Sequence, residues 1–145
     1  MFFGFRFSNN NTVKFMDYLK VNPDWLVIDI GANIGQYSLF AAKLNRKVLA
    51  VEPFIDNIHR FHKSAKTENI GKNIVLLQNA IAEKRNEVKL LGYHSSDIGG
   101  QSLIGNKNET FKKMDPDNKY LVETILLDDI VPYLPKRDDG SDFKQ

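Results

Sequence analysis

The stretch Val27-Ile28-Asp29-Ile30-Gly31-Ala32-Asn33-Ile34-Gly35-Gln36-Tyr37 decides how this chain folds. It begins inside an apolar run from Trp25 to Ile30 that only Asp29 interrupts, and Pro23 and Gly31 bound this run. Such a run is typical of a strand buried on both faces, and burial on both faces favours a parallel sheet. The stretch therefore predicts a buried strand that leads through two glycines into a helix.

The segments around this stretch alternate between helical and strand patterns. Apolar residues recur at helical spacing over about residues 13–20, with Asn11 or Thr12 as the cap, and again over 37–44 and 54–65. The segment 47–51, which is apolar after Lys47, and the apolar run at 74–77 are typical of strands. This β-α-β-α-β order with short connections is the signature of half a doubly wound sheet. We therefore expect an α/β fold, with a Rossmann-like parallel sheet and flanking helices.

The alternation changes after the third predicted strand. Residues 87–91 and 120–126 have strand patterns, and the long polar segment between them predicts a hairpin-like excursion with a mobile loop. A short helix is expected over 127–134, with Asp128 and Asp129 capping it. The alternating phenylalanines of residues 3–7 suggest a short strand or an extended arm.

Composition and charge exclude several classes of protein. The 145 residues are 42% apolar and 26% charged, which is typical of one globular domain and not of a disordered chain. The absence of cysteine excludes disulfides and thiolate catalysis, and no cluster of residues predicts a metal site. A net charge of +2 argues against a nucleic-acid partner. There is no apolar run long enough for a transmembrane segment and no signal-peptide pattern, so a cytoplasmic protein is the default expectation.

The glycine segment is the first candidate site. Gly31 and Gly35 carry no Cβ, so the backbone there can approach a bound cofactor closely. A dinucleotide-binding loop follows G-x-G-x-x-G, but positions 33 and 36 are Asn and Gln, which disfavours an NAD-linked oxidoreductase. The pattern D-x-G-x-x-x-G, which starts at Asp29, is instead typical of S-adenosylmethionine pockets. The alternative is that the two glycines only make a tight turn between strand and helix.

A second acidic residue strengthens the cofactor interpretation. Glu52 closes the second predicted strand, 23 positions after Asp29, close to the offset of about 20 residues at which an acidic side chain meets an adenosine ribose. A carboxylate there can accept hydrogen bonds from both ribose hydroxyls. A single glutamate at a strand end is more often a solvated surface charge. Two acids at the carboxyl ends of adjacent strands, however, favour a ligand site.

Together these segments resemble the FkbM-type family of S-adenosylmethionine-dependent methyltransferases. The resemblance runs from about residue 24 to 134 and is carried by residues 27–40, Val51-Glu52-Pro53, Asn79-Ala80-Ile81 and residues 124–130. It implies a class I methyltransferase fold with S-adenosylmethionine as cofactor. The residues that it implies as cofactor-binding are Asp29, Gly31, Ala32, Asn33, Gly35, Glu52, Pro53, Asn79 and Ala80. In this interpretation Asp29, the glycines and Asn33 surround the methionine portion, Glu52 contacts the ribose, and Asn79 and Ala80 lie beside the adenine.

The resemblance also implies a methyl acceptor, namely a hydroxyl group of a small molecule or a sugar. Because the sulfonium is already activated, the protein must mainly hold the acceptor in line with the methyl group in a dry pocket. The sequence assigns no catalytic residue. His59 and His62 lie on the third predicted helix, with His62 on its apolar stripe, and His94 lies in the polar loop. All three fit structural or solvent-exposed positions better than the role of a general base.

The sequence departs from the family after Leu127-Asp128-Asp129. The family continues into a fourth parallel strand with a K-x-D-x-E-G motif, which this chain lacks. We therefore expect an N-terminal arm and helix at 1–23, a partial methyltransferase domain truncated before the fourth strand at 24–134, and a frayed polar tail at 135–145. The first strand would then form an open edge that favours self-association or a partner chain. The alternative function is a truncated, inactive fragment that acts as a cofactor- or protein-binding module.

Overall fold

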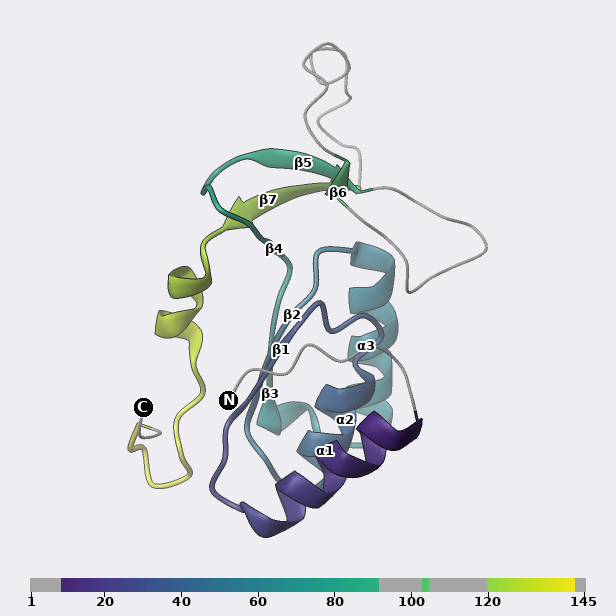
Figure 1. Cartoon of the computed structure of the whole chain (residues 1–145), viewed down its shortest axis with the longest axis vertical. Coiled ribbons are helices and arrows are strands. Elements are labelled where there is room, and N and C mark those ends of the chain that lie inside the picture. The colour runs from purple at the N-terminus through teal and green to yellow at the C-terminus, as the bar shows by residue number, and fades with distance from the viewer. Residues whose placement is uncertain (1–8, 92–102, 105–119, 143–145) are drawn as a thin grey trace.

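The computed structural model describes residues 9–91, 103–104 and 120–142, and its centre is a parallel sheet (Figure 1). The sheet contains β1 (Val27–Ile30), β2 (Val48–Val51) and β3 (Ile74–Leu77) in the order β1-β2-β3. Val27 pairs with Val48, and Val48 pairs with Ile74, so the three strands begin and end at the same level. The predicted α/β fold with a parallel sheet is confirmed. Among the described residues, β1 pairs only with β2.

The helices α1 (Asn9–Val21), α2 (Gln36–Lys43) and α3 (Ile55–Thr67) lie together on one side of this sheet (Figure 1). The core on this side contains Phe15, Ala41 and Phe61 from the helices, packed with Val48 and Ala50 of β2. The other residues of β2 face a second cluster that includes Ile130 of the 3₁₀ helix η3 (Leu127–Tyr133). All four residues of β2 are therefore buried, which is typical of an uninterrupted apolar strand in a parallel sheet.

A second sheet carries the predicted hairpin-like excursion. It contains β4 (Ala80–Ile81), β5 (Val88–Leu91), β6 (Leu103–Ile104) and β7 (Leu121–Ile125) in the order β4-β7-β5-β6. β5 pairs antiparallel with both β6 and β7, while β4 pairs parallel with β7. The β7 residue Thr124 is fully buried. Its hydroxyl donates to the Lys84 carbonyl at 2.7 Å and accepts from the Glu87 N–H at 3.0 Å, which ties β7 to the turn before β5.

A 3₁₀ helix, η1 (Gly71–Asn73), precedes β3, and η3 follows β7. The expected cap of η3 is present at Asp129, whose Oδ2 accepts the Leu126 N–H at 2.9 Å. The Arg85 guanidinium holds the same carboxylate, with Nη2 donating to Oδ1 at 2.6 Å and Nε at 2.9–3.0 Å from both oxygens. Asp129 thus joins the turn before β5 to the start of η3.

Three expectations about local structure were wrong. α1 begins at Asn9, so Asn11 and Thr12 lie inside the helix and do not cap it. His62 is exposed, because the buried face of α3 follows Phe61 and Ala65 and position 62 points to solvent. Ile30 is 36% exposed, so burial on both faces does not extend to the end of β1. The expected strand at 3–7 and the loop around His94 lie outside the described residues.

Candidate cofactor site

The loop between β1 and α2 folds over the carboxyl end of β2. The N–H groups of Gly31 and Ala32 both donate to the Val51 carbonyl, at 2.8 and 3.1 Å, and the Gly35 N–H donates to the Ala32 carbonyl at 2.8 Å. Gly31, Asn33 and Gly35 have φ angles of 75°, 54° and 87°. Glycine adopts this left-handed region without strain, and asparagine tolerates it better than most residues. The loop therefore owes its shape to the residue types at these three positions.

The two glycines of this loop have different surroundings. A Cβ on Gly35 would lie 2.6 Å from two ring carbons of Phe61, a fully buried residue of α3. A Cβ on Gly31 would meet nothing within 4 Å. Gly35 thus allows α2 and α3 to pack closely, while Gly31 leaves open space beside the backbone at the end of β1. Open space beside a backbone is what a loop that admits a ligand requires.

Glu52 follows β2 and turns its carboxylate toward the loop. It is 5% exposed and accepts three hydrogen bonds. The Asn33 N–H donates to Oε2 at 2.8 Å, while the Phe54 N–H and the Asn57 side-chain amide donate to Oε1 at 3.0 and 3.2 Å. Burial raises the pKa of Glu52 above its ordinary value, these hydrogen bonds oppose that rise, and the negative charge of Asp29 adds to it.

Asp29 lies on the neighbouring strand and is equally buried, with 8% of its surface exposed. The hydroxyl of Ser38, a fully buried residue of α2, donates to Asp29 Oδ2 at 2.6 Å. Burial raises the pKa of Asp29, and the hydrogen bonds from Ser38 lower it. None of the ion pairs in the described part of the chain involves Asp29 or Glu52. Two acids are thus buried close together, and neither forms an ion pair with any described side chain.

One further acceptor in the loop lacks a partner. The Oδ1 atom of Asn33 is buried, and no group within the described ranges donates to it. The side chains of Asn33, Asp29 and Glu52 therefore all offer oxygen atoms that can accept hydrogen bonds at this site. A ligand that complements them would bring N–H or O–H donors and positive charge. S-adenosylmethionine fits this requirement, since it carries an ammonium group, a sulfonium and two ribose hydroxyls.

The remaining predicted site residues lie at the same end of the parallel sheet. Pro53 directly follows Glu52 and is half-buried. Ala80 opens β4 and is 3% exposed, packed in a cluster with Phe54 and Val122. Asn79 comes just after β3, and its side-chain amide donates to the Glu123 carbonyl at 3.4 Å. The structure thus places these residues after β2 and β3, next to the strand ends that carry Asp29 and Glu52.

Sequence reasoning missed Ser38 and Asn57, the two side chains that hydrogen-bond to the acids. Each is a polar residue at a buried position of an otherwise apolar helix face: Ser38 lies one turn before Ala41 and Ala42, and Asn57 one turn before Phe61. A polar residue on such a face is the signal that could have identified them, because it needs a buried partner. A third missed residue is Tyr120, whose ring stacks on Phe54 with centroids 5.2 Å apart and an interplanar angle of 7°.

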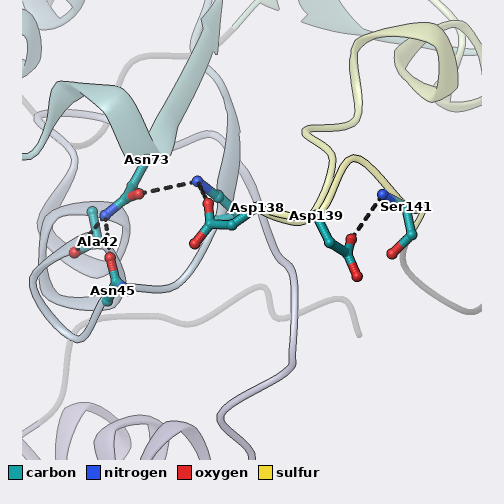
Figure 2. A network of polar contacts seen from close by, with 7 residues as sticks. Ala42, Asn45, Asn73, Asp138, Asp139 and Ser141 are labelled. Carbon is teal, nitrogen blue, oxygen red and sulfur yellow. Dashed lines mark hydrogen bonds and ion pairs between the residues drawn. The ribbon is translucent and has the colours of Figure 1, made fainter.

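A cavity of about 470 Å³ lies at the opposite end of the sheet, before β1 and β2. Its lining includes Trp25, Arg46, Lys47 and Asp138. Lys47 pairs with Asp138 at 2.7 Å and also donates to Asn73 Oδ1 at 3.4 Å. Figure 2 labels Asn73 and Asp138 in this polar network. The positive and negative groups there partly satisfy one another. Because it lies at the other end of the strands, this cavity is separate from the site that contains Asp29 and Glu52.

Comparison with known proteins gives limited similarity. No family model and no curated protein matches the chain. Among solved structures, a protein from Klebsiella pneumoniae assigned as an O-methyltransferase matches with a TM-score of 0.43 and 11% identity, over 49% of this chain and 34% of its own. A protein from Clostridium thermocellum assigned as an rRNA methylase matches with a TM-score of 0.43 and 21% identity, over 52% and 43%. The structure of EvdMO1 matches with a TM-score of 0.39 and 19% identity, over 52% and 18%.

This chain therefore spans less than half the length of each of these three structures. Similarity at this level identifies no family, and the site residues themselves must support any function. Within the described ranges, no helix is long and apolar enough to cross a membrane, and no three histidine, aspartate or glutamate side chains gather into a set that could hold a metal ion.

Proposed function

We propose that this chain binds S-adenosylmethionine at the carboxyl ends of β1 and β2 and forms the cofactor-binding part of a methyltransferase. One observation supports this proposal above the others: Asp29 and Glu52 are buried beside a glycine loop and have no ion-pair partner in the described residues. A protein that buries two carboxylates loses their hydration free energy. A cationic ligand rich in hydroxyl donors would restore much of that loss.

Each part of the site has a role in this proposal. Glu52 would accept a hydrogen bond from a ribose hydroxyl through Oε2, the carboxylate oxygen that takes one donor among the described residues. Asp29 would face the positively charged methionine portion, and the open backbone at Gly31 would admit it. The positions of Ala32, Pro53, Asn79 and Ala80 beside the cofactor follow from the resemblance to FkbM-type enzymes. When bound, the cofactor supplies a methyl group on a sulfonium, which is ready for transfer without further activation.

Charge separates this cofactor from a nicotinamide dinucleotide. The sulfonium and ammonium groups outweigh the single carboxylate of S-adenosylmethionine, which leaves it with a net positive charge. A dinucleotide brings a negatively charged pyrophosphate to the loop after the first strand. Asp29 is the penultimate residue of that strand, and it is buried close to Glu52, where a further negative charge is unfavourable. The site thus favours the sulfonium cofactor on electrostatic grounds as well as through its loop pattern.

We further propose that the chain is of FkbM type and that the methyl acceptor is a hydroxyl of a small molecule or a sugar. Both statements rest on the resemblance of residues 27–40, 51–53, 79–81 and 124–130 to that family. The described histidines offer no clear general base, because His59 and His62 are both exposed on α3. The chain's own contribution to methyl transfer would therefore be to bind and orient the cofactor.

Isothermal titration calorimetry with S-adenosylmethionine tests the proposal. We expect saturable binding, and we expect Glu52→Ala to weaken it by about 1–3 kcal/mol, the range for leaving a buried hydrogen-bonding group without its partner. The matched pair Glu52→Gln and Asp138→Asn converts one carboxylate to an amide at each end of the sheet, and only Glu52→Gln should weaken binding. A folded protein that gives no heat with S-adenosylmethionine would refute the proposal, and a saturable rise in NADH fluorescence would favour an oxidoreductase. Binding without methyl transfer would favour the inactive binding module.

A further inference from the structure

Asn57 is a buried polar residue directly behind the candidate site. It lies on the face of α3 that also buries Phe61 and Ala65, and its side chain is 1% exposed. Its Nδ2 donates to Glu52 Oε1 at 3.2 Å, and its Oδ1 accepts from Arg60 Nη1 at 3.4 Å. The amide therefore presents its donor end to the carboxylate. An oxygen in that place would oppose a negative charge inside the protein.

The hydrogen bonds to Glu52 divide unevenly between its two oxygens. A carboxylate offers about four lone-pair directions in total. Among the described residues, two groups donate to Oε1, the Phe54 N–H and Asn57 Nδ2, and one donates to Oε2, the Asn33 N–H. Within the described ranges Oε2 therefore has fewer protein donors than Oε1 and is the oxygen better placed to accept from a ligand hydroxyl. Asn57 is also the one side chain that donates to Glu52 in the described part of the chain, since the other two donors belong to the backbone.

We propose that Asn57 is a positioning residue for the cofactor. Its side-chain amide holds Glu52 Oε1, so that the carboxylate stays ionised with Oε2 directed to the ligand. A donor on an ionised carboxylate favours the ionised form over the protonated one. The inference rests on the proposed function, because the ligand of Oε2 is taken to be the cofactor ribose. It goes beyond that function by assigning a role to a residue that would not touch the cofactor.

Asn57→Asp tests this role, because it keeps the side-chain shape and replaces the donor by a second acid. Two carboxyl groups at this distance share one proton, and a protonated Asp side chain can donate to Glu52 as the amide does. Two charges face this pair from the described elements: Asp29 on β1, which acts on Glu52, and the Arg60 guanidinium, which lies 3.4 Å from Asn57 Oδ1 and would favour the ionised form of the new acid. At pH 8 we expect S-adenosylmethionine to bind about 10- to 100-fold more weakly to the variant than to the wild type.

The direction of the pH dependence separates positioning from a general structural effect. Lowering the pH should strengthen binding to Asn57→Asp, because the shared proton restores the donor. It should weaken binding to the wild type, because Glu52 becomes protonated. If the two proteins respond to pH in the same direction, Asn57 does not position Glu52.

Asn73→Asp is the matched control. Asn73 is also buried, at 4% exposure, and also sits in an amide network, with Nδ2 donating to the Ala42 carbonyl and Asn45 Oδ1 (Figure 2). It lies at the opposite end of the sheet from Glu52. We expect this variant to lose stability but to bind S-adenosylmethionine with the affinity and pH trend of the wild type. A change in its pH trend equal to that of Asn57→Asp would overturn the assignment.

Nuclear magnetic resonance of the ligand-free protein separates this inference from the proposed function. In the wild type, the Asn57 side-chain amide resonances should shift with the same midpoint as the Glu52 carboxyl resonance. In Asn57→Asp, the Glu52 midpoint should rise by more than about one pH unit. Separate midpoints in the wild type would refute the role of Asn57, even where the variant does not fold. Failure of the wild type to bind S-adenosylmethionine would instead refute the proposed function. The titration midpoints would still show whether Asn57 acts on Glu52.

Discussion

Replacing Gly35 by alanine should destabilise the fold by about 2–5 kcal/mol. Two costs contribute: a non-glycine residue with φ of 87° carries about 1–2 kcal/mol of strain, and overpacking a core costs about 1–3 kcal/mol. The overpacking arises because the new Cβ would lie 2.6 Å from the Phe61 ring. Phe61 is fully buried in the cluster with Ala41, Val48 and Ala65, so its ring cannot move aside without displacing them.

Gly31→Ala is the matched control, because it introduces the strain without the clash. Gly31 has φ of 75°, close to that of Gly35, but its added Cβ would meet nothing within 4 Å. Both substitutions also reduce the conformational freedom of the unfolded chain by the same amount, which cancels when the two are compared. We therefore expect Gly35→Ala to be less stable than Gly31→Ala by the overpacking cost alone, about 1–3 kcal/mol.

Urea unfolding followed by circular dichroism measures this difference, provided that the slope of the free energy against urea is the same for both variants. Equal losses in the two variants would refute the packing argument, since strain alone would then explain both. S-adenosylmethionine binding gives a second comparison. Gly31→Ala fills space that we assign to the cofactor, so it should weaken binding even though it remains the more stable variant. If its affinity equals that of the wild type, the cofactor does not approach the backbone at Gly31.

Two further predictions concern the acidic residues. Asp29→Asn should stabilise the ligand-free protein near neutral pH, because burial raises the pKa of Asp29 in the folded state and its ionised form therefore costs stability, while an amide can still accept from Ser38. The gain in the free energy of unfolding should appear as pH rises through the folded-state pKa of Asp29 and should vanish below its unfolded-state pKa of about 3.9. A higher urea midpoint for the variant that persists at pH 3 would contradict this prediction. Asp129→Ala should lower the melting temperature more than Arg85→Ala, because only the first also removes the acceptor of the Leu126 N–H at the start of η3. Equal melting temperatures would show that this cap contributes nothing.

The sequence predicts the parallel sheet well because its strands are short apolar runs with clear ends. Ile74–Leu77 coincides with β3, and the strand expected at 47–51 differs from β2 by one residue. The predictions fail where a side chain is partly exposed, or where contact with a residue distant in the sequence determines the local structure. Ile30 is apolar and follows a buried strand, yet no described element covers it. The two-residue strand β4 is too short to leave a pattern and exists because Ala80 pairs with Thr124 far along the chain.

The candidate site follows the same division. The positions of Asp29 and Glu52 could be predicted from strand ends, because the carboxyl ends of parallel strands meet at one edge of a sheet. The contacts that orient them could not. Whether Asn57 reaches Glu52 depends on the direction in which the chain enters α3 after β2. Two hydrogen bonds set this direction: the Phe54 N–H donates to Glu52 Oε1, and the Asn57 N–H donates to the Phe54 carbonyl. The sequence shows only that a polar residue lies on a buried face.

The polar groups of the site are arranged at a cost to the ligand-free fold. Burial raises the pKa of both Asp29 and Glu52, and the negative charge of Asp29 raises that of Glu52 further, so each ionised carboxylate lowers the stability of the folded state as pH rises. A protein selected for stability alone would have apolar side chains at these positions, as this protein has at the neighbouring buried Val51. The hydrogen bonds from Ser38, Asn57 and the loop N–H groups reduce this cost without removing it, because they bring no positive charge. The remaining free energy is available to a cationic ligand, which would therefore stabilise the folded state more at neutral pH than below the pKa values of the two acids.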